Sequence, residues 1–191
     1  MSKNFIVIKS QDRGGSHFIK HELLPKFQTR NNYIYDINNE YGMFKNKIWD
    51  YFDDLPDINE FINFVPHKKD SFANVIFEEA TGFFSRAGSS SNNILKHVTR
   101  RFHSQNLNVF VFHSLLKIPN DIRSYMDFLV LFRTDDDPIE VAKDFKSFPR
   151  IVSSFNRIQT LTEGTEFNRE LKTYPDQRSK EFFHYKEVIA K

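Results

Sequence analysis

Short runs of apolar and aromatic residues recur along the chain, separated by longer stretches in which apolar residues fall at helical spacing. The runs expected to form strands are 5–8, 33–36, 74–78, 107–112 and 128–132. Runs of this kind, rich in β-branched and aromatic residues, are typical of strands that are buried on both faces. Because strands alternate with helix-sized segments, the pattern predicts βαβ units and a central, mostly parallel sheet.

The segments between and after these runs predict the helices. Apolar residues recur at helical spacing from His17 to Phe27, and a further helix is expected over 94–104 with Asn93 as its cap. Residues 45–69 predict one or two short helices with loops. The C-terminal part predicts a helix from Pro138 to about Lys146, a helix over 149–159 and a β-hairpin at the sheet edge within 167–188.

The chain length and composition limit the alternatives. A length of 191 residues suits a single domain over 1–191, with a core over 4–135 and the C-terminal helices and possible hairpin over 138–191. The 22 Phe predict an aromatic-rich core, and the absence of Cys excludes disulfides and thiolate metal sites. No run approaches the roughly 18 apolar residues that a membrane span needs, so none is expected.

The charge balance says little about partners by itself. Lys and Arg number 27 and Asp and Glu 25, which leaves a net charge of only +2. Any contact with nucleic acid must therefore come from a local patch or from a ring of subunits.

Two adjacent carboxylates, Glu78 and Glu79, end the buried run that starts at Phe72. Ligands of open α/β sheets bind at the carboxyl ends of the strands, so this placement indicates a site. The alternative is a strand that runs into a solvated, acidic helix start, where Glu also suits the helix dipole.

A polar loop from Lys9 to Ser16 joins the first strand to the first helix and contains adjacent glycines, Gly14 and Gly15. Backbone N–H groups at such a junction can hold an anion. We therefore expect a phosphate, sulfate or nucleotide to be held by the N–H groups of residues 12–17.

Five features follow one another along the chain. A strand and the glycine-containing loop come first, followed by the strand that ends in Asp36, with Glu40-Tyr41 close behind, and the strand that ends in Glu78-Glu79. A helix with Arg100-Arg101 then leads to a strand that ends in His113, and the segment from Leu115 to Arg123 precedes the last buried strand. In this order they resemble the FtsK/HerA superfamily of P-loop motor ATPases, most of all the small genome-packaging ATPases of viruses with double-jelly-roll capsids. The resemblance covers roughly residues 4–135 and implies a RecA-like P-loop NTPase fold.

The loop departs from the family's GxxxxGK[ST] motif. Alignment puts Gly15 at the position of the motif lysine and Ser16 at the Ser/Thr, so the backbone N–H groups and the hydroxyl are kept while the lysine is lost. Lys9 or Arg13 is expected to supply the missing cation, with His17 and Lys20 as alternatives. The nucleotide-binding residues implied by the resemblance are Lys9, Asp12, Arg13, Gly14, Gly15, Ser16 and His17.

The resemblance also implies roles for the remaining polar residues. Ser16 and Glu78 would bind Mg²⁺, Glu79 would orient the attacking water, and His113 would sense the γ-phosphate. Arg100 and Arg101 would supply an arginine finger to a neighbouring subunit, with Arg86 or Arg123 as alternatives. For His113 the structural alternative is a histidine whose hydrogen bonds are satisfied at a strand end. For the arginines it is a solvated basic helix face.

The implied function is a motor that uses ATP and Mg²⁺ to translocate double-stranded DNA into a preformed capsid. Such a protein would act as a homo-oligomeric ring at a capsid or portal vertex, in the host cytoplasm or on the virion. The missing lysine leaves open a non-hydrolysing P-loop relic that serves as a nucleotide- or DNA-binding scaffold. A filamentous-phage assembly ATPase is a third hypothesis, but those ATPases resemble membrane-anchored proteins and no membrane span is expected in this chain.

Overall fold

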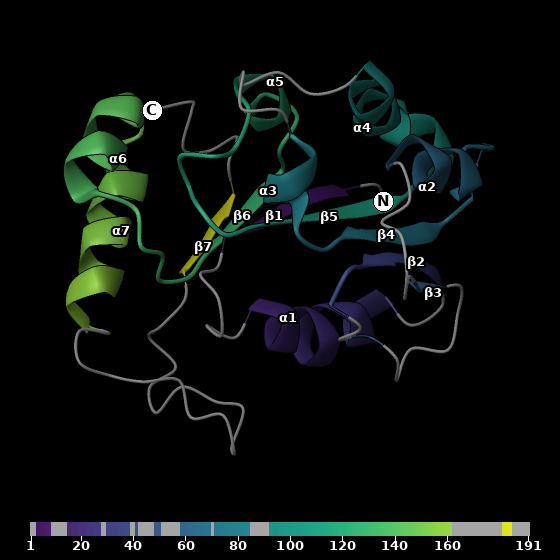
Figure 1. The fold of residues 1–191 in the computed structure, drawn as a ribbon, viewed down its shortest axis with the longest axis horizontal. Helices are drawn as coiled ribbons and strands as arrows, with labels where there is room; N and C mark the ends of the chain where they lie inside the picture. Colours follow the sequence, from purple (N-terminus) through teal and green to yellow (C-terminus); the bar gives the residue numbers. More distant parts are fainter. Residues whose placement is uncertain are drawn as a thin grey trace.

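In the computed structural model, seven strands of the described residues form one sheet with helices on both of its faces (Figure 1). The structure describes residues 3–8, 15–27, 30–38, 41, 48–50, 58–69, 71–84, 92–161 and 181–184. The strands lie in the order β3-β2-β4-β5-β1-β6-β7. Their bounds are β1 (Lys3–Ile8), β2 (Asn31–Asp36), β3 (Ile48–Asp50), β4 (Ala73–Phe77), β5 (Leu107–Phe112), β6 (Phe128–Leu131) and β7 (Glu181–His184).

The five predicted strands form the interior of the sheet and run in one direction. β1 pairs in parallel with β5 and β6, and β4 pairs in parallel with β2 and β5. The prediction of a RecA-like, mostly parallel sheet is therefore confirmed. Because these strands share a direction, all of their carboxyl ends lie at the same edge of the sheet.

The helices follow the predicted apolar spacing. The segment after β1 is helical from Gly15 to Phe27, as α1 (Gly15–Phe18), a π-helical turn η1 (Ile19–Leu23) and a 3-10 turn η2 (Leu24–Phe27). The other helices are α2 (Ile58–Phe64), α3 (Ala80–Phe83), α4 (Asn92–Ser104), α5 (Asn120–Arg123), α6 (Pro138–Asp144) and α7 (Pro149–Leu161). None within the described residues is long and apolar enough to cross a membrane.

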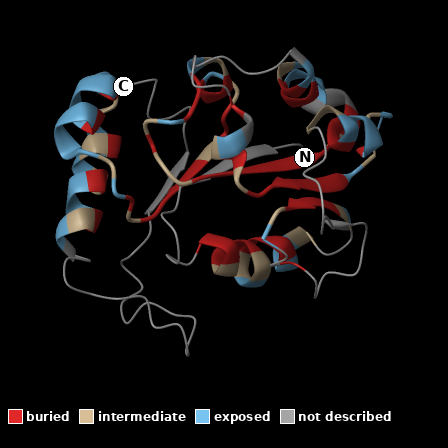
Figure 2. Cartoon of the chain, viewed as in Figure 1, coloured by how far each residue is buried: buried red, intermediate tan, exposed pale blue. Residues whose placement is uncertain are grey.

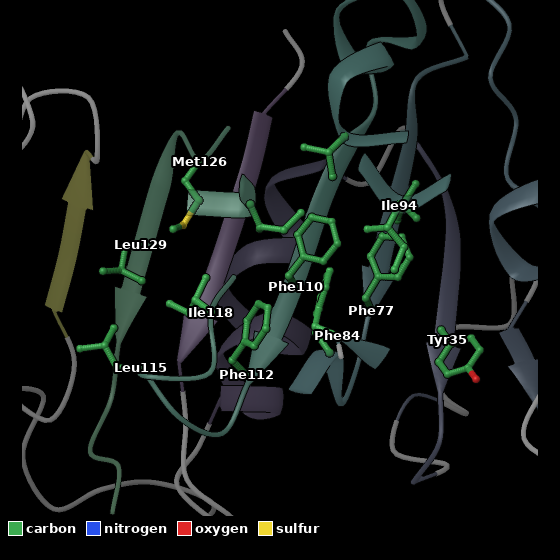
Figure 3. Close-up of a cluster of buried hydrophobic side chains, with 14 of the residues drawn as sticks. Tyr35, Phe77, Phe84, Ile94, Phe110, Phe112, Leu115, Ile118, Met126 and Leu129 are labelled. Atoms are coloured by element: carbon green, nitrogen blue, oxygen red, sulfur yellow. The ribbon is translucent and has the colours of Figure 1, made fainter. Parts of the chain in front are cut away.

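Each face of the sheet carries its own apolar core, because successive side chains of a strand point to opposite faces (Figure 2). Val75 and Phe77 of β4 face the helices from α2 to α7, whereas Ile76 between them faces α1 and η1. Aromatic rings fill the first of these cores, as Figure 3 shows: Phe77 stacks on Phe110 with ring centroids 4.6 Å apart. The prediction of an aromatic-rich core agrees with this packing.

Two local expectations need correction. Residues 48–50 form an edge strand, β3, which pairs with β2, although one or two short helices were expected across 45–69. Helix α4 begins at Asn92, so Asn93 lies inside it and donates through Nδ2 to Asn59 Oδ1 at 2.8 Å. The hairpin predicted within 167–188 stays a prediction: β7 lies in this segment and pairs antiparallel with β6 at the sheet edge, while residues 167–180 and 185–188 lie outside the described residues.

Candidate functional site

Polar side chains from four separate segments meet at the carboxyl edge of the sheet. Asp36 is the last residue of β2, Glu78 and Glu79 directly follow β4, and His113 directly follows β5. Ser16 lies in the first turn of α1, which comes after β1. The parallel sheet brings these residues together because it places all of these strand ends at one edge.

Glu78 lies at the centre of a hydrogen-bonded group. The Ser16 hydroxyl donates to Glu78 Oε1 at 3.1 Å, and the Tyr41 hydroxyl donates to Glu78 Oε2 at 2.8 Å. Tyr41 is in turn held by its backbone N–H, which donates to Asp36 Oδ2 at 2.8 Å. The first turn of α1 is therefore linked to the ends of β2 and β4 through one carboxylate.

The burial of this group is unusual for an acid. Glu78 is fully buried and Asp36 is only 3% exposed, and Asp and Glu are rarely buried to this degree unless they are paired. Hydrogen bonds from two hydroxyls meet part of the cost of removing the Glu78 carboxylate from water. The site thus concentrates negative charge in a place that favours a cation.

The Glu79 side chain makes a separate set of contacts that is more exposed to solvent. Its Oε1 accepts a hydrogen bond from Asn38 Nδ2 at 3.1 Å and lies 2.5 Å from His113 Nε2. The side chains of Glu79 and His113 are 24% and 27% exposed. A solvent-accessible carboxylate in contact with an imidazole can accept a hydrogen bond from water, and it can exchange a proton with the imidazole.

The backbone at Glu79 is held in a conformation that non-glycine residues seldom adopt. Its φ of 60° and ψ of 37° are left-handed, and they turn the chain sharply from β4 into α3. The turn is fixed on both sides, because Glu78 N donates to Tyr35 O and His113 N donates to Thr81 Oγ1 at 3.0 Å. Residues held in such strained conformations concentrate at functional sites.

The oxygen ligands available at Glu78 suit Mg²⁺. Mg²⁺ prefers oxygen ligands and is usually held by one or two protein groups together with water and substrate phosphates, and the Ser16 hydroxyl and Glu78 carboxylate are already in contact. Within the described part of the chain no group of three or more His, Cys, Asp or Glu side chains could hold a metal ion. A metal at this place would therefore depend on phosphate oxygens as further ligands.

Comparison with known proteins identifies the fold. The sequence itself matches no protein-family model and no curated protein. Its structure is similar to that of B204, the DNA-packaging ATPase from Sulfolobus Turreted Icosahedral Virus, with 15% identity, a TM-score of 0.61, and coverage of 83% of this chain and 87% of that one. It is also similar to the genome packaging NTPase B204 from Sulfolobus turreted icosahedral virus 2 in complex with AMP, with 16% identity, a TM-score of 0.65, and coverage of 92% and 97%.

The chain has the fold of these packaging NTPases. The same virus 2 protein in complex with AMPPCP matches with a TM-score of 0.65 and 15% identity over 80% of this chain and 86% of that one. At identities this low the likeness establishes the P-loop NTPase fold, and chemistry must be argued from the residues of this chain.

The described residues include only part of the predicted phosphate loop. Gly15 and Ser16 are buried in α1, and His17 is half-buried beside them. Lys9, Asp12, Arg13 and Gly14 lie outside the described residues, so the expectation that they cradle a phosphate stays a prediction. The same holds for the choice of Lys9 or Arg13 as the compensating cation.

Arg100, one of the predicted finger residues, is not brought to the site of its own chain. Helix α4 ends at the opposite edge of the sheet, where Phe72 N donates to Ser104 O just before β4 begins. Arg100 is exposed and lies one helical turn, about 6 Å, from that end. The side chain of Arg101 and all of Arg86 lie outside the described residues. Contact of Arg100 with a nucleotide would therefore have to be made across a subunit interface.

Tyr41, Asn38 and Thr81 are the residues whose part in the site was not expected from the sequence. The pair Glu40-Tyr41 carried part of the resemblance, but no role for the Tyr41 hydroxyl followed from it. A buried tyrosine needs a partner for its hydroxyl, and an acid-rich site is one place to find such a partner. The partner itself, Glu78, is 37 residues away along the chain and is identified only by the fold.

Proposed function

We propose that this protein is an ATP-driven genome-packaging motor of a virus that moves double-stranded DNA into a capsid. The observation that carries the proposal is the Ser16–Glu78 hydrogen bond at the carboxyl edge of a P-loop NTPase sheet. It pairs a hydroxyl at the start of the first helix with an acid at the end of a strand, as a phosphate and Mg²⁺ site requires. The fold shared with the packaging NTPases supports the same function.

The residues divide the chemistry between them. Backbone N–H groups of the loop that contains Lys9, Asp12, Arg13 and Gly14 and of the helix start, which contains Gly15 and His17, would hold the phosphates. Ser16 and Glu78 would hold Mg²⁺, which when bound neutralises phosphate charge. Because phosphoryl transfer depends mostly on positioning and electrostatics, these fixed contacts are the main contribution of the protein.

Glu79 and His113 would act at the γ-phosphate. The Glu79 carboxylate would accept a hydrogen bond from the attacking water and so align its oxygen with the γ-phosphorus. A bond forms between that oxygen and the γ-phosphorus, the bond from the γ-phosphorus to the β–γ bridging oxygen breaks, ADP leaves with the bridging oxygen, and the water proton is released with the phosphate. A carboxylate has about four acceptor positions, so its contacts with Asn38 and His113 leave room for a water. His113 Nε2 is bonded to Glu79, so it would donate to a phosphate oxygen only in exchange for that bond.

The remaining parts of the proposal concern the assembly. We infer a homo-oligomeric ring in which Arg100 or Arg101 of one subunit reaches the nucleotide of the next, with double-stranded DNA and capsid or portal-vertex proteins as partners. The protein would act in the host cytoplasm and on the virion. The loss of the motif lysine to Gly15 favours one second candidate, a relic that binds nucleotide or DNA without hydrolysis.

Phosphate release from ATP by the purified protein, with Mg²⁺ and double-stranded DNA, distinguishes these candidates. A motor should release phosphate, and Glu79→Gln should lower the rate by at least about 100-fold while ATP still binds. Asn63→Gln, an exposed change on α2, is the matched control and should leave the rate unchanged. ATP binding by wild type without phosphate release, or DNA binding without nucleotide binding, would favour the relic, and binding of neither nucleotide nor DNA would contradict both candidates.

A further inference from the structure

The helix that begins at Gly15 lacks the motif lysine but carries another lysine one turn further on. Lys20 follows Ser16 by four residues. Residues i and i+4 lie on one face of a helix, and long side chains in helices point back toward the N-terminus. This spacing directs the Lys20 side chain toward the turn that contains Ser16, whose hydroxyl bonds to Glu78.

Contacts place this ammonium beside the Glu78 group. Lys20 Nζ lies 5.3 Å from the centroid of the Tyr41 ring, and the hydroxyl of the same ring donates to Glu78 Oε2. Tyr41 is fully buried, while Lys20 is half-buried. The half-buried lysine thus places its charge over the aromatic face of the tyrosine that bonds to Glu78.

The helix changes its hydrogen-bonding register at this residue. Residues Ile19–Leu23 form a π-helical turn between α1 and the 3-10 turn η2. Such π-helical turns inside helices are found frequently at functional sites, where they change the direction of side chains. The register change therefore coincides with the one lysine of this helical run that contacts Tyr41.

Electrostatics favour a move of this ammonium onto phosphate. A nucleotide triphosphate with Mg²⁺ retains negative charge, and a partly desolvated site must balance that charge with a cation. The contact of an ammonium with an aromatic face is weaker than a charge-assisted hydrogen bond to a phosphate oxygen. A flexible four-carbon stem allows Lys20 to exchange one contact for the other without movement of the helix.

We propose that Lys20 supplies the cation for the β- and γ-phosphates in place of the lysine that Gly15 has replaced. The inference rests on the proposed function, since it needs a nucleotide at this site. It differs from the expectation that Lys9 or Arg13 has this role, because it assigns the role to a residue of the helix rather than of the loop.

The test is a comparison of ATP and AMP binding by wild type and three variants, with Mg²⁺ present. Lys20→Ala should weaken ATP binding by about 10- to 100-fold and leave AMP binding within about 2-fold, because AMP lacks the β- and γ-phosphates. Lys20→Arg should restore much of the ATP affinity. Lys26→Ala, an exposed change on η2 of the same helical run, is the control and should bind both nucleotides as wild type does.

The outcomes separate this inference from the proposed function. Equal ATP affinity of wild type and Lys20→Ala would overturn the role of Lys20 while the site itself stands. A parallel loss of ATP and AMP affinity would also overturn it, because an equal loss cannot come from a contact with the β- and γ-phosphates, which AMP lacks. If wild type binds neither nucleotide, the proposed function fails and the role of Lys20 fails with it.

Discussion

His97 is a histidine enclosed in the apolar core. It lies on α4 and is 3% exposed, with its Nε2 2.8 Å from Asn108 Oδ1 on β5. Its ring packs against those of Phe77 and His67, at centroid distances of 5.6 and 5.2 Å. Burial, together with a smaller effect of the charge of His67, lowers the pKa of His97 from 6.5 to about 4, although the bond to Asn108 acts in the opposite direction. At neutral pH the ring is therefore uncharged.

This environment predicts acid lability. The unfolded chain takes up a proton at His97 near pH 6.5, whereas the folded chain does so near pH 4. Stability from this residue is therefore complete above pH 6.5 and is lost as the pH falls toward 4, by roughly 3 kcal/mol in total. His97→Gln keeps an amide donor for Asn108 but does not titrate. Urea unfolding at neutral pH and near pH 4 should show wild type losing about 2–3 kcal/mol more than the variant, and equal losses would contradict the assignment.

At the scale of single residues, the sequence could place the acids but not their partners. Glu78 and Glu79 were located because they end a buried run, which is a local pattern. Tyr41 could not be assigned to Glu78, since that contact depends on how β2 and β4 pair and on where the chain returns after Asp36. The sequence offers Lys9, Arg13, His17 and Lys20 as candidates for the missing cation. The position of Lys20 over Tyr41, which the structure shows, is what favours Lys20 among them.

Arg123 connects two helices that are separate in the sequence. It ends α5 and is 8% exposed, and one of its terminal nitrogens donates to Asp144 Oδ2 of α6 at 2.8 Å. Its guanidinium carbon lies 4.3 Å from the centroid of the Phe145 ring. An arginine used in this way stabilises the packing of α5 against α6. Because of these contacts, the Arg123 side chain is not exposed to a neighbouring subunit as a finger would be.

A structural role for Arg123 predicts a loss of stability on its removal. Arg123→Ala should lower the free energy of unfolding by about 1–3 kcal/mol, through lost packing on Phe145 and a lost charge-assisted bond. Lys143→Ala is the control, because its 3.7 Å pair with Glu140 is exposed and should contribute less than about 0.5 kcal/mol. Urea unfolding of both variants measures the difference. An Arg123→Ala protein as stable as wild type but without ATPase activity would instead support a finger role.

At the scale of elements, long and strongly patterned segments were predictable and short ones were not. The five interior strands and the helices of 13 residues carry enough apolar periodicity to be recognised. β3 has only three residues, and its Trp49 lies in an aromatic-rich stretch that suits a short helix equally well. The edge position of β3 depends on pairing with β2, which is a tertiary contact that local sequence does not encode.

At the scale of the whole molecule, the exposed Arg100 of α4 lies away from the acidic site of its own chain. Lys96 and Arg100 are exposed on α4, while Asp36, Glu78 and Glu79 lie at the carboxyl edge of the sheet. With a net charge of +2, the chain has little overall attraction for DNA or nucleotide, so local charge must do this work. In a ring with head-to-tail contacts, a different surface of each subunit meets each of its two neighbours. Such a ring could bring α4 of one subunit to the acidic edge of the next.

A finger supplied in trans predicts that two inactive variants restore activity when mixed. Arg100→Ala keeps its own Glu79 but gives no finger, whereas Glu79→Gln gives a finger but cannot orient water. Each alone should lose at least about 100-fold in DNA-stimulated phosphate release. In a randomly mixed ring, half of the subunits have Glu79 and half of their neighbours have Arg100, so an equimolar mixture should recover about a quarter of wild-type activity.

The matched control replaces a different exposed cation of the same helix. Lys96→Ala should be fully active alone and should reach about half of wild-type activity when mixed with Glu79→Gln, because every neighbour then carries Arg100. Full activity of Arg100→Ala alone would assign the finger elsewhere, with Arg101 as the next residue to test. A mixture of Arg100→Ala and Glu79→Gln that is no more active than its components would show that the two residues do not meet across an interface.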